Sequence, residues 1–183
     1  DQLLGPEMRS TGEVMGIDIE PGLAFAKSQI AAGEALPSEG GVFFSLADRD
    51  KQAGLLAAKA YADLGFEIIA TPGTAAALAE AGVEVAGVAA KVGEPEPVDG
   101  TVDLPDAVEL IAQGRIHIVV NTPRGRGARA DGAYIRRAAG AAGLPLFTTV
   151  AAASAAAHGI ADLRVHPLHV RPLQAYHQGV HRP

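Results

Sequence analysis

From Gly41 onward, short apolar runs alternate with longer amphipathic stretches rich in alanine. The runs are rich in β-branched or aromatic residues and have the length of buried strands. Parallel strands need long crossover connections, which helices supply. We therefore predict an α/β fold with three layers, α/β/α, around a five-stranded, mainly parallel sheet. The expected strands cover residues 42–46, 66–70, 83–88, 116–121 and 146–149.

The stretches between these runs predict four helices, over residues 50–64, 74–81, 107–113 and 132–142. Asp48 or Asp50 suits the N-cap of the first helix, and Asp131 suits that of the fourth.

Turn-forming residues divide the chain into three expected regions. A glycine-rich opening with one helical patch covers residues 1–39 and ends in a dense turn cluster. The regular α/β pattern covers residues 40–165. A proline- and histidine-containing tail, 166–183, is expected to be irregular.

Composition excludes several classes of protein. The 183 residues are 48% hydrophobic and 20% charged, as in one packed domain with an appendage. With a net charge of −6, the chain lacks the excess of positive charge that is typical of nucleic-acid binders. The absence of cysteine rules out disulfides and thiolate zinc sites, and no apolar run has membrane-spanning length. We expect a soluble, cytoplasmic protein without nucleic-acid or membrane partners.

Polar side chains follow nearly every expected strand. In open α/β sheets, ligands bind beyond the carboxyl ends of the strands, where helix N-termini also point. Hydroxyls, amides and cations at this edge suit a phosphate. The candidates, in strand order, are Ser45 and Lys51; Thr71 and Thr74; Lys91; Asn121, Thr122 and Arg126; and Thr148.

Each candidate also has a structural explanation. Thr74 suits a helix N-cap, Lys91 suits a solvated loop, and Arg126 with Arg124 and Arg129 suits a basic loop. Lys51 is harder to explain in this way, because a cation in a first helical turn opposes the macrodipole unless an anion lies nearby. The conjunction of all these residues at one edge is the signal for a phosphate site.

Other constellations are weaker. The chain has neither a GxxxxGK[ST] phosphate loop nor a strand-linked GxGxxG fingerprint, which argues against an ATPase or a dehydrogenase. His166 and His169 lack a nearby carboxylate pair, so no metal site is expected. His117 is interpreted as structural, and no Ser-His-Asp arrangement stands out.

Two sets of motifs resemble a known family. Residues 4–16 resemble the closing motif of the second ATP-grasp unit in the large subunit of carbamoyl-phosphate synthase. The sequence that follows is similar to the carboxyl-terminal regulatory domain of that subunit, which has a methylglyoxal-synthase-like fold. The resemblance runs from Leu4 to Ala157 and includes 44–46 with 50–51, 70–75, 119–123, 131–132 with 135–139, and 148–149.

The resemblance implies that the chain, which does not begin with Met, is a fragment or a processed product of that subunit. The parent ligase makes carbamoyl phosphate from bicarbonate, glutamine-derived ammonia and ATP, with Mg or Mn, for pyrimidine and arginine biosynthesis. Its ATP-grasp domains lie upstream, and a glutamine amidotransferase small subunit is its partner. The fragment itself is expected to have no catalytic residue and no cofactor. A homo-oligomer is also compatible with the sequence.

In bacterial relatives, the resembling domain binds UMP as inhibitor and IMP as activator. By this resemblance, Lys51, Thr71, Thr74 and Lys91 hold the phosphate, while Ser45 and Asn121 contact the rest of the nucleotide. Thr148 matches half of an ornithine site whose other ligands lie upstream, so that half-site is expected to be inert.

Departures from the family pattern bear on the ligand. Pro123 replaces a threonine of some relatives and so removes one hydrogen-bond donor for base selection, and Pro72 replaces a polar residue. The alternative function is a methylglyoxal synthase acting on dihydroxyacetone phosphate. That reaction needs a carboxylate base beside the phosphate, for which Glu94 and Glu96 are the candidates.

Overall fold

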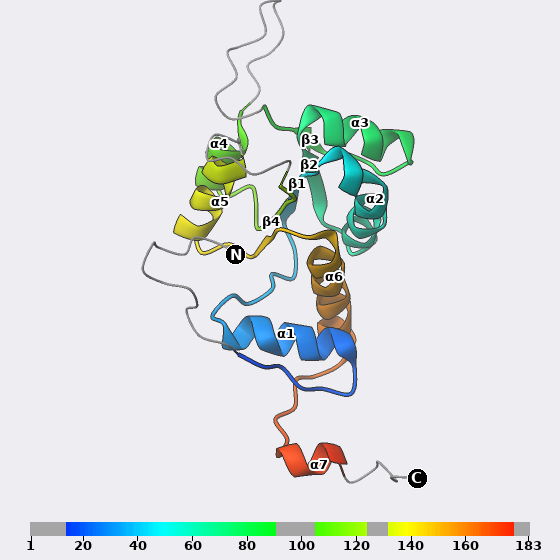
Figure 1. Cartoon of the computed structure of the whole chain (residues 1–183), viewed down its shortest axis with the longest axis vertical. Coiled ribbons are helices and arrows are strands. Elements are labelled where there is room, and N and C mark those ends of the chain that lie inside the picture. The colour runs from blue at the N-terminus through cyan, green and yellow to red at the C-terminus, as the bar shows by residue number, and fades with distance from the viewer. Residues whose placement is uncertain (1–13, 91–104, 124–131, 178–183) are drawn as a thin grey trace, which may run out of the picture.

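Five strands form one parallel sheet at the centre of the molecule, in the order β3-β2-β1-β4-β5 (Figure 1). The structure is a computed structural model that describes residues 14–90, 105–123 and 132–177. The strands are β1 Gly41–Ser45, β2 Glu67–Ala70, β3 Gly87–Val88, β4 Ile118–Asn121 and β5 Leu146–Phe147.

Helices cover both faces of this sheet (Figure 1). On one face lie α2, α3 and α6, and on the other lie α4 and α5. The prediction of a three-layer α/β/α fold around a parallel sheet is therefore confirmed. The helices are α1 Pro21–Ala31, α2 Asp48–Asp63, α3 Pro72–Glu80, α4 Ala107–Ala112, α5 Gly132–Ala141, α6 Val150–Val165 and α7 Leu173–His177.

Successive side chains of each strand point to opposite faces, and this creates two separate hydrophobic cores. In β1, Val42 and Phe44 join the core beneath α2, α3 and α6, whereas Phe43 joins the core beneath α4 and α5. All three side chains are fully buried. The central strands can be apolar along their whole length because a doubly covered parallel sheet has no solvent-facing side.

Several expected strand boundaries were wrong, because residues at the expected strand ends form hydrogen bonds with helix ends instead. The backbone N–H of Val83 donates to the carbonyl of Leu78 at the end of α3 (3.0 Å), so β3 begins only at Gly87. The hydroxyl of Thr149 accepts from the N–H of Ala152 (3.2 Å) as the N-cap of α6, so β5 ends at Phe147.

The start of α2 also differs from the prediction. Its N-cap residue is Ala47, which has no side-chain acceptor, and Asp48 and Asp50 lie within the first turn. Neither carboxylate is therefore the N-cap, although both are in the position that complements the helix dipole. Asp131, the expected cap of the fourth helix, lies outside the described residues.

Segments from both terminal regions belong to the described structure, and Lys27 of α1 donates to the carbonyl of His169 in the tail (2.8 Å). Helix α1 lies across α6 (Figure 1), and Leu23 and Ala26 of α1 are buried. The segment expected to be irregular, 166–183, contains the short helix α7.

The buried hydroxyl of Tyr61 gives a pH-dependent prediction. The side chain is fully buried in α2, and its hydroxyl donates to the carbonyl of Ala153 (3.0 Å). Burial raises the pKa of Tyr61 above its ordinary value of 10.0. The contribution of Tyr61 to the free energy of unfolding is therefore fully present below pH 10.0 and falls as the pH rises beyond it. Tyr61→Phe is expected to cost about 1 kcal/mol at pH 7 and to flatten the alkaline fall in urea denaturation. Tyr134→Phe, at an exposed position, should retain the wild-type fall; the same slope in both variants would contradict the assignment.

Candidate functional site

Four buried polar side chains gather at the carboxyl ends of the central strands. They are the buried polar residues of the described part of the chain, and all four are predicted site residues: Thr71, Thr74, Asn121 and Thr122. In the register of the sheet, Ser45 pairs with Asn121, and Phe44 pairs with the residue that precedes Thr71. The structure thus brings Ser45, which is half-buried, together with Thr71, Thr74, Asn121 and Thr122.

Thr71 and Thr74 join the ends of two strands at the start of α3. Thr71 is the N-cap residue, so the prediction of Thr74 as the N-cap was wrong. The Thr71 hydroxyl donates to Thr74 Oγ1 (3.1 Å), and the Leu46 N–H donates to the same oxygen (3.1 Å). Thr74 therefore fixes the position of α3 relative to the loop after β1.

Thr122 makes the equivalent connection on the other side of β1. Its Oγ1 accepts from the N–H of Ala47 (2.8 Å), and its own N–H donates to the carbonyl of Ser45 (3.0 Å). The loop after β1 is thus held from both neighbouring strands. Such cross-connections set the shape of the edge before any ligand arrives.

Asn121 is held by a cation that the sequence prediction did not include. Arg136 Nη1 donates to Asn121 Oδ1 (2.8 Å). A Cβ at Gly132 would lie 2.6 Å from Arg136 Nη1 and 2.7 Å from Asn121 Oδ1, so glycine makes room for this bond. Residues four apart share one face of a helix, which relates Gly132 to Arg136, but no sequence spacing indicates the contact of Arg136 with Asn121, 15 residues away.

Lys51 places its charge beside the start of α3. Its ammonium lies 2.7 Å from Asp48 Oδ1, so Asp48 is the nearby anion that offsets a cation in the first turn of α2; the Lys51 side chain is 25% exposed. The Nζ atom lies 3.6 Å from the position that a Cβ of Gly73 would occupy. A cation therefore lies next to Gly73 at the start of α3, where the helix dipole also attracts anions.

Arg49 is a further cation at this edge that the prediction missed. Its Nη2 donates to the carbonyl of Pro123 (2.7 Å), and its Nε lies 3.6 Å from Asp50 Oδ2. The contact joins α2 to the segment after β4. No sequence spacing indicates it, because the two partners are 74 residues apart.

The remaining candidates are not part of this group. Thr148 is half-buried at the end of the outer strand β5, and β4 lies between that strand and β1. Lys91 and Arg126 lie outside the described residues, as do Arg124, Arg129, Glu94 and Glu96.

The described residues hold no group of three His, Asp or Glu side chains that could bind a metal ion. None of the helices in this part of the chain is both long enough and apolar enough to cross a membrane.

Comparisons with known proteins agree with this architecture. The model of a family described as MGS-like domain matches residues 54–148. The chain is 49% identical over 179 residues to the carbamoyl phosphate synthase large chain of Acidobacterium capsulatum. It is 50% identical to that of Renibacterium salmoninarum and 44% identical to that of a Synechocystis species, each over 176 residues. The alignments cover 96 to 98% of this chain but only 16% of each relative. The resemblance drawn from the sequence is thereby confirmed, and the chain belongs to the MGS-like domain family.

Proposed function

We propose that this chain is the allosteric regulatory part of a carbamoyl phosphate synthase large chain and that it binds a phosphorylated nucleotide at the carboxyl edge of its sheet. The observation that carries the proposal is the position of the Lys51 ammonium at the start of α3. The relatives named carbamoyl phosphate synthase large chain support the assignment to that protein.

In this proposal, the phosphate binds between Lys51 and the first turn of α3. The ammonium supplies charge, and the Gly73 N–H at the start of α3 is the proposed donor from a second element. Pro72 has no N–H, and the N–H of Thr74 already donates to the Thr71 carbonyl (2.9 Å). Thr71 and Thr74 lie behind this position, and their mutual hydrogen bond keeps the start of α3 in place. Lys91 is proposed as a second cation on the phosphate. Binding then carries little entropic cost for ordering the site, because the hydrogen bonds of Thr74 and Thr122 already hold the loop after β1.

The rest of the nucleotide is proposed to lie over the ends of β1 and β4. Ser45 and Asn121 are neighbours in the register there, and Thr122 and Arg126 follow in the chain. Because Arg136 already donates to Asn121 Oδ1, the Asn121 amide nitrogen is proposed as the donor to a base or sugar oxygen. UMP and IMP are the proposed ligands.

The proposal assigns no catalytic residue and no cofactor to this chain. Carbamoyl phosphate synthesis, with its ATP and Mg or Mn, is placed in the ATP-grasp domains of the parent ligase, and glutamine hydrolysis in its small subunit. The nucleotide then controls carbamoyl phosphate supply for pyrimidine and arginine biosynthesis in the cytoplasm. Thr148 is the half of an ornithine site that this chain would contribute.

Calorimetric titration of the purified chain with UMP, IMP and inorganic phosphate tests the proposal. We expect saturable binding of at least one nucleotide, tighter than that of phosphate, because the sugar and base add contacts beyond Lys51. Binding of phosphate and both nucleotides with equal affinity would limit the site to a simple anion. No binding of any of the three would contradict a nucleotide site in this chain.

A further inference from the structure

A hydrogen bond at the carboxyl edge of the sheet determines which end of the Asn121 amide is left for a ligand. Arg136 Nη1 donates to Asn121 Oδ1 (2.8 Å). A guanidinium has five donors and no acceptor, so only the oxygen of an amide can form this contact. The NH₂ group of Asn121 is therefore the end that remains for another partner, and it can only donate.

The NH₂ group of Asn121 can be reached from outside the protein. The hydrogen bonds within the described part of the chain give Asn121 Oδ1 a donor but give the amide nitrogen no acceptor. Among the described residues, no fully buried side-chain nitrogen or oxygen lacks a partner. The nitrogen is therefore not fully enclosed, although Asn121 as a whole is only 3% exposed. An acceptor on a ligand can meet this donor at the end of β4.

Arg136 also makes Asn121 a better donor. A hydrogen bond from a charged group is about twice as strong as one between neutral groups. Hydrogen bonds in series polarise one another, so an amide that accepts from a cation donates more strongly through its nitrogen. No carboxylate of the described residues forms an ion pair with Arg136. Its charge therefore acts on the amide without a described counter-ion.

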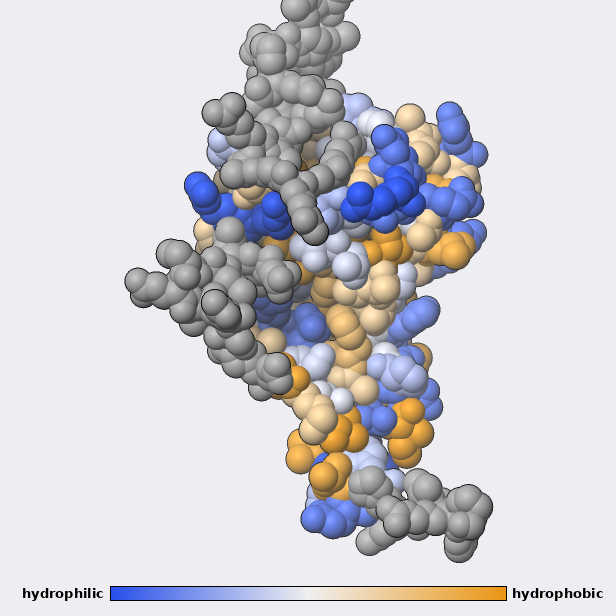
Figure 2. Space-filling model, in the orientation of Figure 1, coloured by the Kyte–Doolittle hydropathy of each residue, from blue (hydrophilic) through white to orange (hydrophobic). Residues whose placement is uncertain are grey.

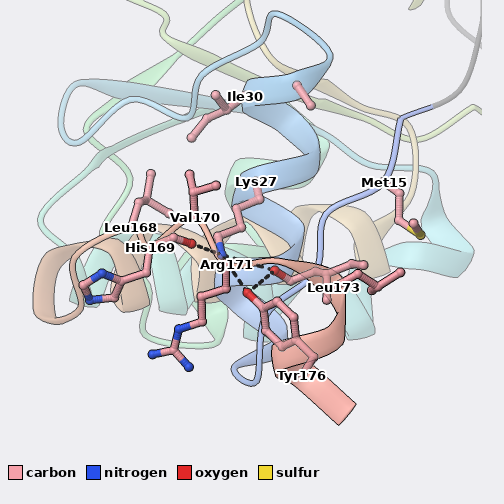
Figure 3. Close-up of a pocket in the computed structure, with 11 residues that line it drawn as sticks. Met15, Lys27, Ile30, Leu168, His169, Val170, Arg171, Leu173 and Tyr176 are labelled. Carbon is pink, nitrogen blue, oxygen red and sulfur yellow. Dashed lines mark hydrogen bonds between the residues drawn. The ribbon is translucent and has the colours of Figure 1, made fainter. Parts of the chain in front are cut away.

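Lys27, a half-buried cation at the end that carries α1 and α7, has a different role. Its ammonium donates to a carboxylate, Asp18 Oδ2 (2.5 Å), and to the His169 carbonyl and the Tyr176 hydroxyl (Figure 3). Figure 2 shows apolar side chains, in orange, over much of this end. Lys27 is thus paired with an anion and links segments of the chain, whereas Arg136 holds a neutral amide at the edge with the proposed phosphate position.

The position of Asn121 indicates which part of a nucleotide it would meet. The proposed phosphate position lies at the start of α3, which follows β2, whereas Asn121 ends β4. Strand β1 lies between β2 and β4, so two strand spacings, about 10 Å, separate the two positions. The sugar of a nucleotide is next to its phosphate, and the base lies beyond the sugar. The base is therefore the part that reaches Asn121.

We propose that Arg136 is a positioning residue that holds Asn121 as a hydrogen-bond donor, so that the site selects a base with a keto oxygen at this position over a base with an amino group. This inference rests on the proposed function and deepens it. A keto oxygen accepts and an exocyclic amino group donates, so only the keto oxygen matches a fixed NH₂ group. Uracil and hypoxanthine present a keto oxygen where cytosine and adenine present an amino group.

Calorimetric titration of the purified chain with UMP and CMP tests the role of Arg136. The wild type should bind UMP about three- to tenfold more tightly than CMP, which is the effect of one hydrogen bond. In Arg136→Met, the Asn121 amide can turn its oxygen toward an amino group, so this affinity ratio should fall toward one. The control Arg137→Met makes the same change in net charge at the exposed next position of α5 and should keep the wild-type ratio.

Two further variants test whether Arg136 acts through Asn121. A Cβ in Gly132→Ala would lie 2.6 Å from Arg136 Nη1 and 2.7 Å from Asn121 Oδ1. This variant disturbs the hydrogen bond without changing the charge, and it should lower the affinity ratio as Arg136→Met does. In Asn121→Ala, which has no amide, adding Arg136→Met should leave the ratio unchanged. An unchanged ratio in Arg136→Met, or the same fall with and without the Asn121 amide, would overturn the positioning role.

NMR of the free chain separates this inference from the proposed function. The side-chain NH₂ resonances of Asn121 are identified by their loss in Asn121→Ala, and dispersed spectra verify that each variant is folded. These resonances should shift in Arg136→Met but not in Arg137→Met, because only the first change removes the donor to Oδ1. Resonances that stay in place in both variants would overturn the inference.

The two measurements together show which proposal fails. Wild-type binding of UMP and CMP with equal affinity would contradict base selection through Arg136 and leave the nucleotide site standing. Expected NMR shifts without binding of any nucleotide would contradict the proposed function, and base selection with it.

Discussion

Replacing Thr74 by valine is expected to lower the free energy of unfolding by about 2 to 3 kcal/mol, although the two side chains have nearly the same shape. Thr74 is fully buried. Its hydroxyl oxygen accepts hydrogen bonds from the Leu46 N–H and from the Thr71 hydroxyl. Valine would remove the acceptor of both hydrogen bonds, and the loss of a buried acceptor costs about 1 to 3 kcal/mol. Urea denaturation at neutral pH measures the loss.

Two further variants separate the hydroxyl from the general effect of a Thr→Val change. Thr148→Val, at a half-buried position after β5, should stay within about 0.5 kcal/mol of the wild type. Thr74→Ser keeps the acceptor and should recover most of the stability. Equal losses in Thr74→Val and Thr148→Val would show that the connection between β1 and α3 does not depend on this oxygen.

The layered sheet could be predicted from the sequence because its signal is local. Each buried strand of a doubly covered sheet is one continuous apolar run, and the helices between the runs have their own amphipathic pattern. The exact strand ends depended on competition with helix ends. Val83 and Thr149 are both suited to a strand by residue type, but each satisfies a backbone group at a helix terminus instead.

The candidate site could be predicted only as a set of positions. Residues that follow parallel strands meet at one edge in any such fold, which is why Ser45, Thr71 and Asn121 were grouped correctly. Their hydrogen-bond partners could not be predicted. The contact of Arg49 with Pro123 depends on how α2 lies against the segment after β4, and no local rule gives that distance.

The contacts between α1 and the tail could not be predicted from the sequence. Lys27 reaches Tyr176, a partner 149 residues away in the chain. Each segment alone is polar or short, so neither pattern indicates a contact. Lys27 links α1 to the tail through the His169 carbonyl and the Tyr176 hydroxyl.

Lys51→Met is expected to weaken nucleotide binding by about tenfold or more, because a hydrogen bond to a charged group contributes about 1.5 to 3 kcal/mol. The ammonium is the described cation that lies at the start of α3, so its loss removes charge from the phosphate position itself. Calorimetric titration with UMP and IMP measures the change. The matched control is Lys59→Met, which makes the same change in net charge at an exposed position on the same helix.

The free energy of unfolding should not fall with Lys51→Met, in contrast to the nucleotide affinity. The ion pair of Lys51 with Asp48 is partly exposed, and such pairs contribute about 0 to 1 kcal/mol. Lys51 also places a positive charge in the first turn of α2, where the helix dipole disfavours it. Lys51→Met should therefore leave the free energy of unfolding unchanged or slightly higher while affinity falls. A residue kept for an anion rather than for folding has this signature. If Lys51→Met and Lys59→Met weaken binding equally, the nucleotide senses only the net charge, and its phosphate lies elsewhere.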